Sequence, residues 1–372
     1  MSPHKRRPLR RGVEVEYWVI DGEGRLVEPA ALVESSPAAE REFVEPLLEI
    51  KTPPCETTSE LHRELFDRLG RVLRRADSLD RGLVPLGTPI TDDEIAELPS
   101  DRTRVQNLVV GEGFEHVRHC AGTHIHVEQR PGNEIDQLNA LVALDPALAL
   151  ANSSPYFQGE RLAVGARSKL YRRMSYDDLP HQGRLWRYVD TVDEWTRRLE
   201  RRYEEFVTAA LDAGVDRRTV ESNFDPDRAI WTPVQLRKTF GTVEWRSPDA
   251  ALPSQVVRLA DDVAGIVDRL KDTDVRIEGD TGAVTDEEIV LPEFDAVLEY
   301  VDAAIESGID SQPVRSYLDR MGFDVASYEP TSHGVDDGET VTSAKARRIR
   351  LDHAERLERD VLQGGRSIAT GG

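Results

Sequence analysis

Residues 12–19 read Gly-Val-Glu-Val-Glu-Tyr-Trp-Val, a run in which acidic and apolar side chains alternate. Successive side chains of a β-strand point to opposite faces of its sheet, so Glu14 and Glu16 share the face opposite Val13 and Val15. The same alternation recurs in three later segments, Leu47–Ile50, Thr123–Val127 and Thr242–Arg246. Ionisable groups gathered on one face are costly to desolvate unless metal ions or charged substrates neutralise them. The pattern therefore predicts a sheet with one core face and one face for chemistry.

Turn and helix signals surround these strands. Asp21-Gly22-Glu23-Gly24 is typical of a hairpin turn, after which residues 25–27 can return antiparallel to the first strand. Thr57 and Glu60 have the spacing of a capping box and predict a helix directly after them. Apolar periodicity predicts three more helices, at about 134–150, 192–213 and 254–270.

The chain divides into four expected parts. Residues 1–11 form a flexible basic tip, 12–272 the catalytic domain, 273–364 a helical segment packed on it, and 365–372 a disordered tail. Asp, Thr and Gly are frequent from Asp272 to Asp286, which predicts a loop before the helical segment. Residues 331–338 read as a second loop.

The charge balance limits the classes of partner. Acidic residues outnumber basic ones by 69 to 48, which gives a formal net charge of -21. Such a field repels a nucleic-acid backbone, so a nucleic-acid partner is not expected. The chain has few lysines, and an acidic surface of this kind fits a salt-rich cytoplasm; the alternative is an ordinary acidic protein. Two cysteines and no apolar segment resembling a signal sequence or membrane span favour a cytoplasmic protein without a membrane partner.

Two kinds of metal site are consistent with the strand pattern. Carboxylates on one wall suit Mg²⁺, which prefers hard oxygen ligands and accompanies phosphates. His124 and His126 point into the same space and leave zinc hydrolysis open, as in metal-dependent amidohydrolases. The histidines at 181, 333 and 353 lie in segments that resemble loops or surface helix and do not extend such a zinc site. Each glutamate taken singly is also compatible with a solvated strand face.

A nucleotide site of standard type is missing from the sequence. No segment matches the Walker A loop or a dinucleotide fingerprint. Arginine forks suit carboxylates and phosphates, and cations cluster after Asn152-Ser153-Ser154-Pro155-Tyr156 at Arg161, Arg167, Lys169, Arg172 and Arg173, with Arg237, Lys238 and Arg246 farther on. A solvated basic patch is the alternative. Cys120 is interpreted as a small buried thiol and not as a nucleophile.

Five motifs in order carry a resemblance to a known family. They are Gly12–Glu16, Glu45–Cys55, Cys120–Val127, Ala151–Gly159 and Gly241–Arg246, and they span residues 12 to 250. The chain resembles the glutamate cysteine ligase family of the second type, which also contains broader carboxylate-amine ligases. Its Gly165-Ala166-Arg167-Ser168-Lys169-Leu170-Tyr171-Arg172 differs from the family's usual Gly-x-x-Ser-x-Arg in the position of the cations.

The resemblance implies an α+β fold similar to that of glutamine synthetase. Its curved, mainly antiparallel sheet has helices on one face, and a C-terminal helical extension follows. The implied metal ligands are Glu14, Glu16, Glu49, His124, His126 and Glu244, with Glu42 a further candidate. Arg246 and Glu244 are the implied catalytic residues. The implied substrate and nucleotide contacts are Arg167, Lys169, Arg172, Arg237, Asn152 and Ser154.

The implied reaction uses ATP and Mg²⁺, with more than one ion expected. ATP phosphorylates the glutamate side-chain carboxylate, and the cysteine amine then displaces phosphate from this acyl phosphate to give γ-glutamylcysteine. A different amine acceptor is the close alternative; a zinc amidohydrolase and a non-catalytic binding protein are the alternatives of other classes. The resemblance leaves a homo-oligomer open.

Overall fold

A seven-stranded antiparallel sheet forms the centre of the molecule. The computed structural model describes residues 7–91 and 95–370. The long first strand β1 (Arg11–Asp21) pairs with β3 (Leu47–Lys51) and β4 (Arg81–Val84) and, farther toward its start, with β5 (Thr123–Glu128). β5 pairs with β9 (Thr242–Trp245), β9 with β8 (Val234–Arg237), and β2 (Ala39–Arg41) with β3. All four predicted strand segments therefore belong to one sheet.

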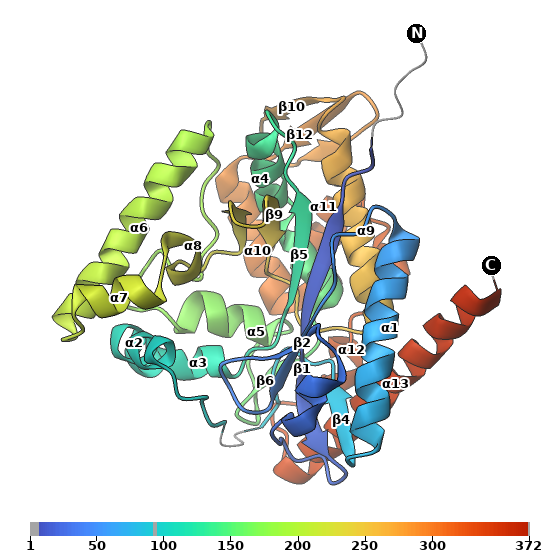
Figure 1. Cartoon of the computed structure of the whole chain (residues 1–372). Helices are drawn as coiled ribbons and strands as arrows, with labels where there is room; N and C mark the ends of the chain where they lie inside the picture. Colours follow the sequence, from blue (N-terminus) through green and yellow to red (C-terminus); the bar gives the residue numbers. More distant parts are fainter. Residues whose placement is uncertain (1–6, 92–94, 371–372) are drawn as a thin grey trace.

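One face of this sheet is core. Val13, Val15 and Tyr17 of β1 are buried there, together with Ile50 and Ile125 from the neighbouring strands. This face packs against α1 (Thr58–Asp77), α4 (Glu134–Ala143) and α9 (Pro253–Arg269), as Figure 1 shows for α1 and α9 beside β1. The predicted capping box begins α1, where Thr57 accepts from the backbone of Glu60. The α+β fold with an antiparallel sheet is confirmed.

A second group of helices stands on the other side of β1 and β5. It comprises α2 (Asp101–Val110), α3 (Phe114–Arg118), α5 (Ala166–Lys169), α6 (Val192–Asp212), α7 (Arg217–Asn223) and α8 (Pro226–Ala229). Figure 1 shows these helices to the left of the sheet, away from α1. The sheet thus has helices toward both faces, where the sequence predicted them on one.

The predicted helices keep their positions with one exception. Both ends of α6 and both ends of α9 lie within one residue of the expected positions. The helix expected at 134–150 ends at Ala143 and continues as the 3-10 segment η3 (Asp145–Ala151). Pro146 explains the change, because proline has no backbone N–H and clashes with the preceding helical turn. Residues 25–27, expected to form a strand antiparallel to β1, form a single antiparallel bridge to it, between Ile20 and Leu26.

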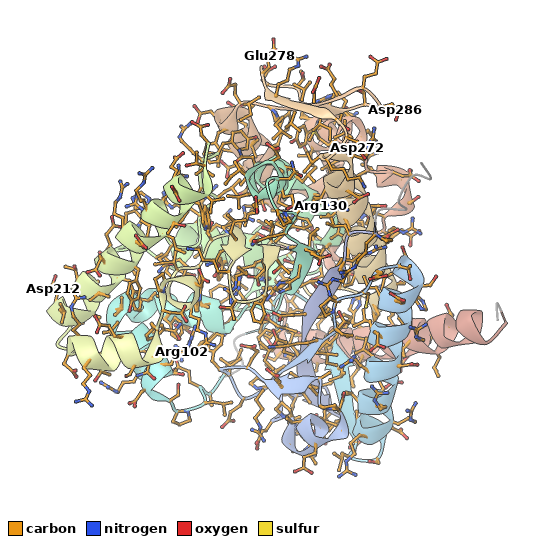
Figure 2. All side chains as sticks on the ribbon, turned by 45° about the horizontal axis from the view of Figure 1, so that its top comes forward. Arg102, Arg130, Asp212, Asp272, Glu278 and Asp286 are labelled. Carbon is orange, nitrogen blue, oxygen red and sulfur yellow. The ribbon has the colours of Figure 1, made fainter. Side chains whose placement is uncertain are left out.

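The C-terminal part contains a small sheet that the sequence did not predict. β10 (Asp274–Ile277) and β11 (Ala283–Val284) lie where a loop was expected, and β12 (Glu288–Leu291) lies just after it, where helix was expected. Asp272, Glu278 and Asp286 project around this sheet at the edge of the molecule (Figure 2). Helices α10 (Phe294–Ser307), α11 (Gln312–Arg320), α12 (Ser332–Val335) and α13 (Ser343–Thr370) follow. α12 occupies part of the second expected loop.

Both predicted ends need correction where the structure describes them. Arg10 donates a 2.9 Å hydrogen bond to Glu128, and Arg11 is buried and bonded to Asp261, so these two residues are anchored and not part of a flexible tip. α13 packs on α1 and β4 and is helical through Thr370, where a disordered tail was expected from residue 365. Residues 1–6 and 371–372 lie outside the described residues. Among the described helices, none has the length and apolar character needed to cross a bilayer.

The described chain also contains a short two-stranded hairpin and several short helical segments. β6 (Tyr156–Phe157) and β7 (Glu160–Arg161) form a hairpin near residue 340, and α5 continues into the π-helical segment η4 (Leu170–Met174). The remaining 3-10 segments are η1 (Ala30–Ser35), η2 (Gly111–Gly113), η5 (Gly308–Asp310) and η6 (Val325–Ser327).

Candidate active site

Strand register brings the ionisable residues together. Glu14 of β1 is the Cα partner of His124 on β5 and of Lys51 on β3. Glu16 is paired with Glu49, and His126 with Glu244. Directly opposed residues of antiparallel strands share a face, so these pairs form adjoining rows on the face away from the core. Residues separated by more than two hundred positions in the chain therefore become neighbours.

A cavity of about 400 Å³ lies over this face. It is lined by every candidate metal ligand: Glu14, Glu16, Glu42, Glu49, His124, His126 and Glu244. The opposite wall comes from the second group of helices, through residues of α2, α3, α5 and α8. The sheet supplies one side of the cavity and the helices the other.

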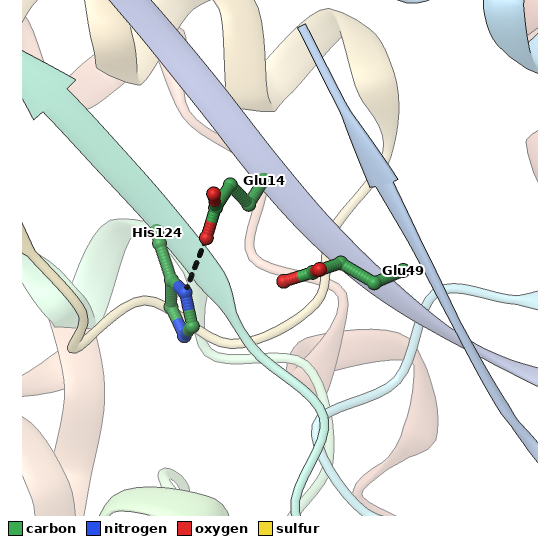
Figure 3. A group of neighbouring side chains, drawn as sticks. All are labelled: Glu14, Glu49 and His124. Atoms are coloured by element: carbon green, nitrogen blue, oxygen red, sulfur yellow. Dashed lines mark hydrogen bonds and ion pairs between the residues drawn. The ribbon is translucent and has the colours of Figure 1, made fainter. Parts of the chain in front are cut away.

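Three groups of side chains have ligand atoms close enough to share metal ions. Glu14, Glu49 and His124 form one group, Glu14, His126 and Glu244 a second, and Glu16, Glu42 and Glu49 a third; the ligand atoms within each lie within 4.8 Å of one another. Figure 3 shows Glu14, Glu49 and His124 reaching from three strands toward a common space. Glu14 and Glu49 each belong to two groups, so the three positions are contiguous.

The electrostatics of the cluster call for added cations. Burial and the neighbouring Glu16 raise the pKa of Glu42 to about 8, and burial with Glu42 raises the pKa of Glu49 well above its usual value. Burial opposes ionisation of Glu14, but the neighbouring imidazoles of His124 and His126 lower its pKa below the usual range. Carboxylates this close cannot all ionise without positive charge among them.

The donor set suits a hard divalent ion such as Mg²⁺. Two buried ligand atoms, Glu244 Oε2 and His126 Nε2, have no hydrogen-bond partner among the described residues. Unpaired buried acceptors are rare and costly, and a bound cation would satisfy both. Carboxylates outnumber imidazoles in each of the three ligand groups. The described part of the chain places none of His181, His333 or His353 on the cavity wall. The arrangement favours Mg²⁺ over zinc.

Arginines border the carboxylate cluster. Arg246 Nη1 lies 3.0 Å from Glu244 Oε1, and Arg237 Nε lies 3.5 Å from Glu244 Oε2. Burial would lower the pKa of Arg246, but the neighbouring Glu244 raises it above its usual value. Burial would raise the pKa of Glu244, but the neighbouring Arg246 lowers it to about 2. Arg167 donates to the backbone oxygens of Ser247 and Arg246 at 3.0 and 3.2 Å, which fixes the end of β9. The cavity thus combines a carboxylate cluster with guanidinium groups that suit phosphate oxygens.

The sequence profile of Glutamate-cysteine ligase family 2 (GCS2) matches residues 10–327. The chain belongs to this family. A candidate glutamate–cysteine ligase 2 of Chloroflexus aggregans is 27% identical over 254 residues, which cover 64% of this chain and 59% of that protein. A second such relative, from Rhodococcus jostii, is 28% identical over 256 residues, covering 66% of this chain and 63% of that one. The chain therefore spans about three-fifths of the length of these relatives.

Solved structures show the same fold. A glutamate–cysteine ligase of Francisella tularensis in complex with AMP has a TM-score of 0.52 at 13% identity, covering 98% of this chain and 94% of that one. A bifunctional glutathione synthetase of Pasteurella multocida has a TM-score of 0.56 at 14% identity, covering 95% of this chain and 53% of that one. At these identities the likeness shows the fold alone.

Four residues predicted to contact substrate or nucleotide lie away from the cavity of this family 2 protein. Asn152 and Ser154 are fully buried, with Asn152 donating to the backbone oxygen of Ala304 at 3.0 Å and Ser154 bonded to Thr88 at 2.6 Å. Lys169 pairs with Glu306 at 2.8 Å on α10. These three side chains therefore make contacts within the protein and do not line the cavity where ligand contacts were expected.

Arg172 is the fourth. It is buried and forms a 2.6 Å ion pair with Asp145, which also accepts a 2.8 Å hydrogen bond from Trp245 Nε1. This network links η4 to the end of β9 and so supports the position of Glu244 and Arg246 without entering the cavity. Of the predicted cationic contacts, Arg167, Arg237 and Arg246 line the cavity.

Several cavity residues of the family 2 protein were missed by sequence reasoning. Lys51 Nζ lies 2.7 Å from Glu49 and 3.0 Å from Glu40, in the middle of the carboxylates. Burial would lower the pKa of Lys51, but Glu49 and Glu14 raise it. The sequence signal that could have identified Lys51 was its position two residues after Glu49 on the same strand, which puts both side chains on the same face. The helices supply further cavity residues, Arg102, Gln106, Val117, Tyr171 and Arg228, and non-helical segments supply Phe43 and Trp231.

Proposed function

We propose that this protein is an ATP- and Mg²⁺-dependent ligase that joins the glutamate γ-carboxylate to the amine of cysteine. The observation that carries the proposal is the contiguous set of three carboxylate and imidazole groups beside Arg246 in one cavity. Phosphoryl transfer depends on positioning and on neutralising charge over the transferred oxygens, and such a set provides for both. Membership of the family supports the same class of reaction.

Space for the substrates is available. A second cavity of about 270 Å³ adjoins the first and shares Glu14, Lys51, His126 and Phe240 with it. Phe240 is 59% exposed at the tip of the β8–β9 hairpin, and its ring meets that of His126 edge-on at 5.9 Å. The two connected spaces suit a nucleotide and two amino acids better than a single small substrate.

The reaction proceeds in two steps. An oxygen of the γ-carboxylate attacks the γ-phosphorus of ATP, the bond to ADP breaks, and an acyl phosphate forms. The neutral amine of the acceptor then attacks the acyl carbon, phosphate leaves, and the amine proton is released. Glu14, Glu16, Glu42, Glu49, His124, His126 and Glu244 would hold Mg²⁺, which would neutralise charge on the phosphate oxygens. Arg246, aligned by its pair with Glu244, stabilises charge on the transferred group, and Arg237 and Arg167 flank it.

The direct test is nucleotide turnover with a panel of amines. Purified protein in high potassium chloride receives ATP, Mg²⁺ and glutamate, with cysteine, other amines or no amine, and ADP release is followed. We expect cysteine-dependent release with γ-glutamylcysteine detected by mass. Release only with another amine would keep the ligase and change its acceptor. Absence of release under every condition, or product formation without ATP, would overturn the proposal.

A further inference from the structure

One face of helix α2 looks into the cavity across from the carboxylates. Arg102 and Gln106 lie one turn apart on α2 and both line the cavity, whereas Val105 and Val109 of the same helix are buried in the core. The Ser100 hydroxyl caps the helix by accepting from the backbone of Thr103 at 2.9 Å. A capped, core-anchored helix therefore presents a guanidinium and an amide side by side at fixed positions.

Arg102 has no carboxylate partner among the described residues. Its Nη2 donates to the backbone oxygen of Arg228 at 3.0 Å, and its guanidinium carbon lies 4.9 Å from the centre of the Phe224 ring. Burial and the neighbouring Arg228 lower the pKa of Arg102, so its surroundings disfavour its charge. Arg102 thus faces the cavity with only a backbone oxygen and an aromatic ring as described partners. An anionic ligand would supply the partner.

Gln106 points to the same conclusion independently. The residue is 6% exposed as a whole and lines the cavity, and its amide is not among the buried polar atoms that lack a partner, so the amide is open to the cavity. It is therefore available to hydrogen-bond a ligand there. A ligand that satisfies both side chains must offer acceptor oxygens to the guanidinium and to the amide N–H groups.

The surrounding wall narrows the class of ligand. Phe43, Val117 and Trp231 line the cavity with Arg102 and Gln106 and provide apolar surface for a small side chain. The sheet opposite carries the candidate metal ligands and Arg246, so the reacting group of an amino-acid substrate faces the sheet. The orientation that suits all three surfaces then places the α-carboxylate on α2.

We propose that Arg102 and Gln106 bind the α-carboxylate of an amino-acid substrate and thereby select amino acids over simple amines or simple acids. This inference rests on the proposed ligase function. The carboxylate belongs either to the acceptor or to the donor, and both offer the same chemistry to α2. Arg102 and Gln106 act in binding and orientation, so their loss affects KM more than kcat.

The test compares each amino acid with its analogue that lacks the α-carboxylate. Cysteine is compared with cysteamine, and glutamate with 4-aminobutyrate, for wild type, R102Q, R102K and Q106L. We expect KM for one amino acid to rise about 10- to 100-fold in R102Q, the loss typical of a hydrogen bond to a charged group. KM for the matching analogue and for ATP stays within about twofold. Whether cysteine or glutamate is affected identifies the source of the carboxylate.

Arg104 provides the matched control on the same helix. Its side chain is 54% exposed and lies 3.7 Å from Asp101, outside the cavity lining. R104Q should retain wild-type KM values. R102K retains the charge without the fork and should fall between wild type and R102Q. If R102Q does not fold, Q106L carries the same test, with a smaller expected rise for the same amino acid.

The outcomes separate this inference from the proposed function. Equal losses for an amino acid and its analogue, or a rise confined to the KM of ATP, would overturn the role of α2 while leaving the ligase. Calorimetry with a non-hydrolysable ATP analogue and Mg²⁺ measures amino-acid binding without turnover. If no amine gives product but R102Q still selectively weakens amino-acid binding, the ligase proposal fails and this one stands. If wild type binds neither amino acid, this inference is wrong.

Discussion

Glu14 is the side chain on which the candidate metal positions converge, because it belongs to two of the three groups. We expect E14Q to lower ligase activity by at least about 100-fold, since the change removes a ligand charge at nearly constant volume. The same variant should bind Mn²⁺ more weakly in a direct titration. E288Q, at a partly exposed glutamate of β12 outside the cavity, is the control and should behave as wild type. Unchanged turnover and Mn²⁺ affinity in E14Q would contradict the site.

His353 makes stability depend on pH. It is buried on α13, its Nδ1 has no hydrogen-bond partner in the described structure, and burial with Arg356 lowers its pKa from 6.5 to about 4. Above pH 6.5 the histidine is neutral in both states and the stability is complete; as the pH falls from 6.5 to about 4, the unfolded chain takes up the proton first and stability is lost.

The expected loss is on the order of 3 kcal/mol in the free energy of unfolding. Denaturant titrations of wild type and H353L between pH 8 and pH 4 measure it, and their difference removes the contribution of the carboxylates. H353L should be less sensitive to acid across this window. Parallel curves for the two proteins would refute the assignment.

Alternation alone placed Glu14 with Glu16, His124 with His126 and Glu244 with Arg246 on shared faces, because a period of two fixes the face of every side chain once the strand is recognised. It could not assign Arg102 or Gln106, whose role depends on where α2 packs. The family resemblance implied Arg172 as a ligand contact; its partner Asp145 lies 27 positions earlier, and no local pattern reveals the pair. Side chains set by local geometry were predictable, and those set by tertiary packing were not.

Among the helices, α13 depends on a close approach to α1. A Cβ at Gly364 would overlap the ring of the buried Phe66, whereas a Cβ at the adjacent Gly365 would meet nothing within 4 Å. We expect G364A to lower the free energy of unfolding by about 1–3 kcal/mol through overpacking. G365A should raise it by roughly 0.5–1 kcal/mol through helix propensity. Chemical denaturation of the two variants checks the opposite signs; equal effects would show that this packing is loose.

Helices were easier to predict than the smaller strands. Long amphipathic helices such as α1 and α6 repeat their apolar pattern over several turns. β10, β11 and β12 have only two to four residues each, too few for a periodic signal to stand out, although Ile289 and Leu291 of β12 are buried. The break between α4 and η3 could have been predicted from Pro146, which the long apolar run around it concealed.

The excess of acidic charge acts on the molecule as a whole. Exposed carboxylates such as Asp212 and Asp286 project from opposite ends of it (Figure 2). With a net charge of -21, self-repulsion should destabilise the folded state at low salt. We expect the melting temperature to rise between about 0.1 M and 1 M KCl, as the screening length falls from about 10 Å to 3 Å. Sucrose at equal osmolality, which does not screen charge, is the control. A flat or falling melting temperature in KCl would contradict the salt-adapted interpretation.

The cavity draws on strands from both ends of a long stretch of chain, since β1 and β5 precede α6 and α7 while β9 follows them. Gly214, in the exposed turn between α6 and α7, divides the sequence between these contributions. A break there leaves Glu14, Glu49 and His124 on one fragment and Glu244 and Arg246 on the other. Neither fragment holds a whole cavity, and the ladder between β5 and β9 is the seam along which they would rejoin. If the chain were divided at this turn, we expect activity to return only when the two fragments reassociate.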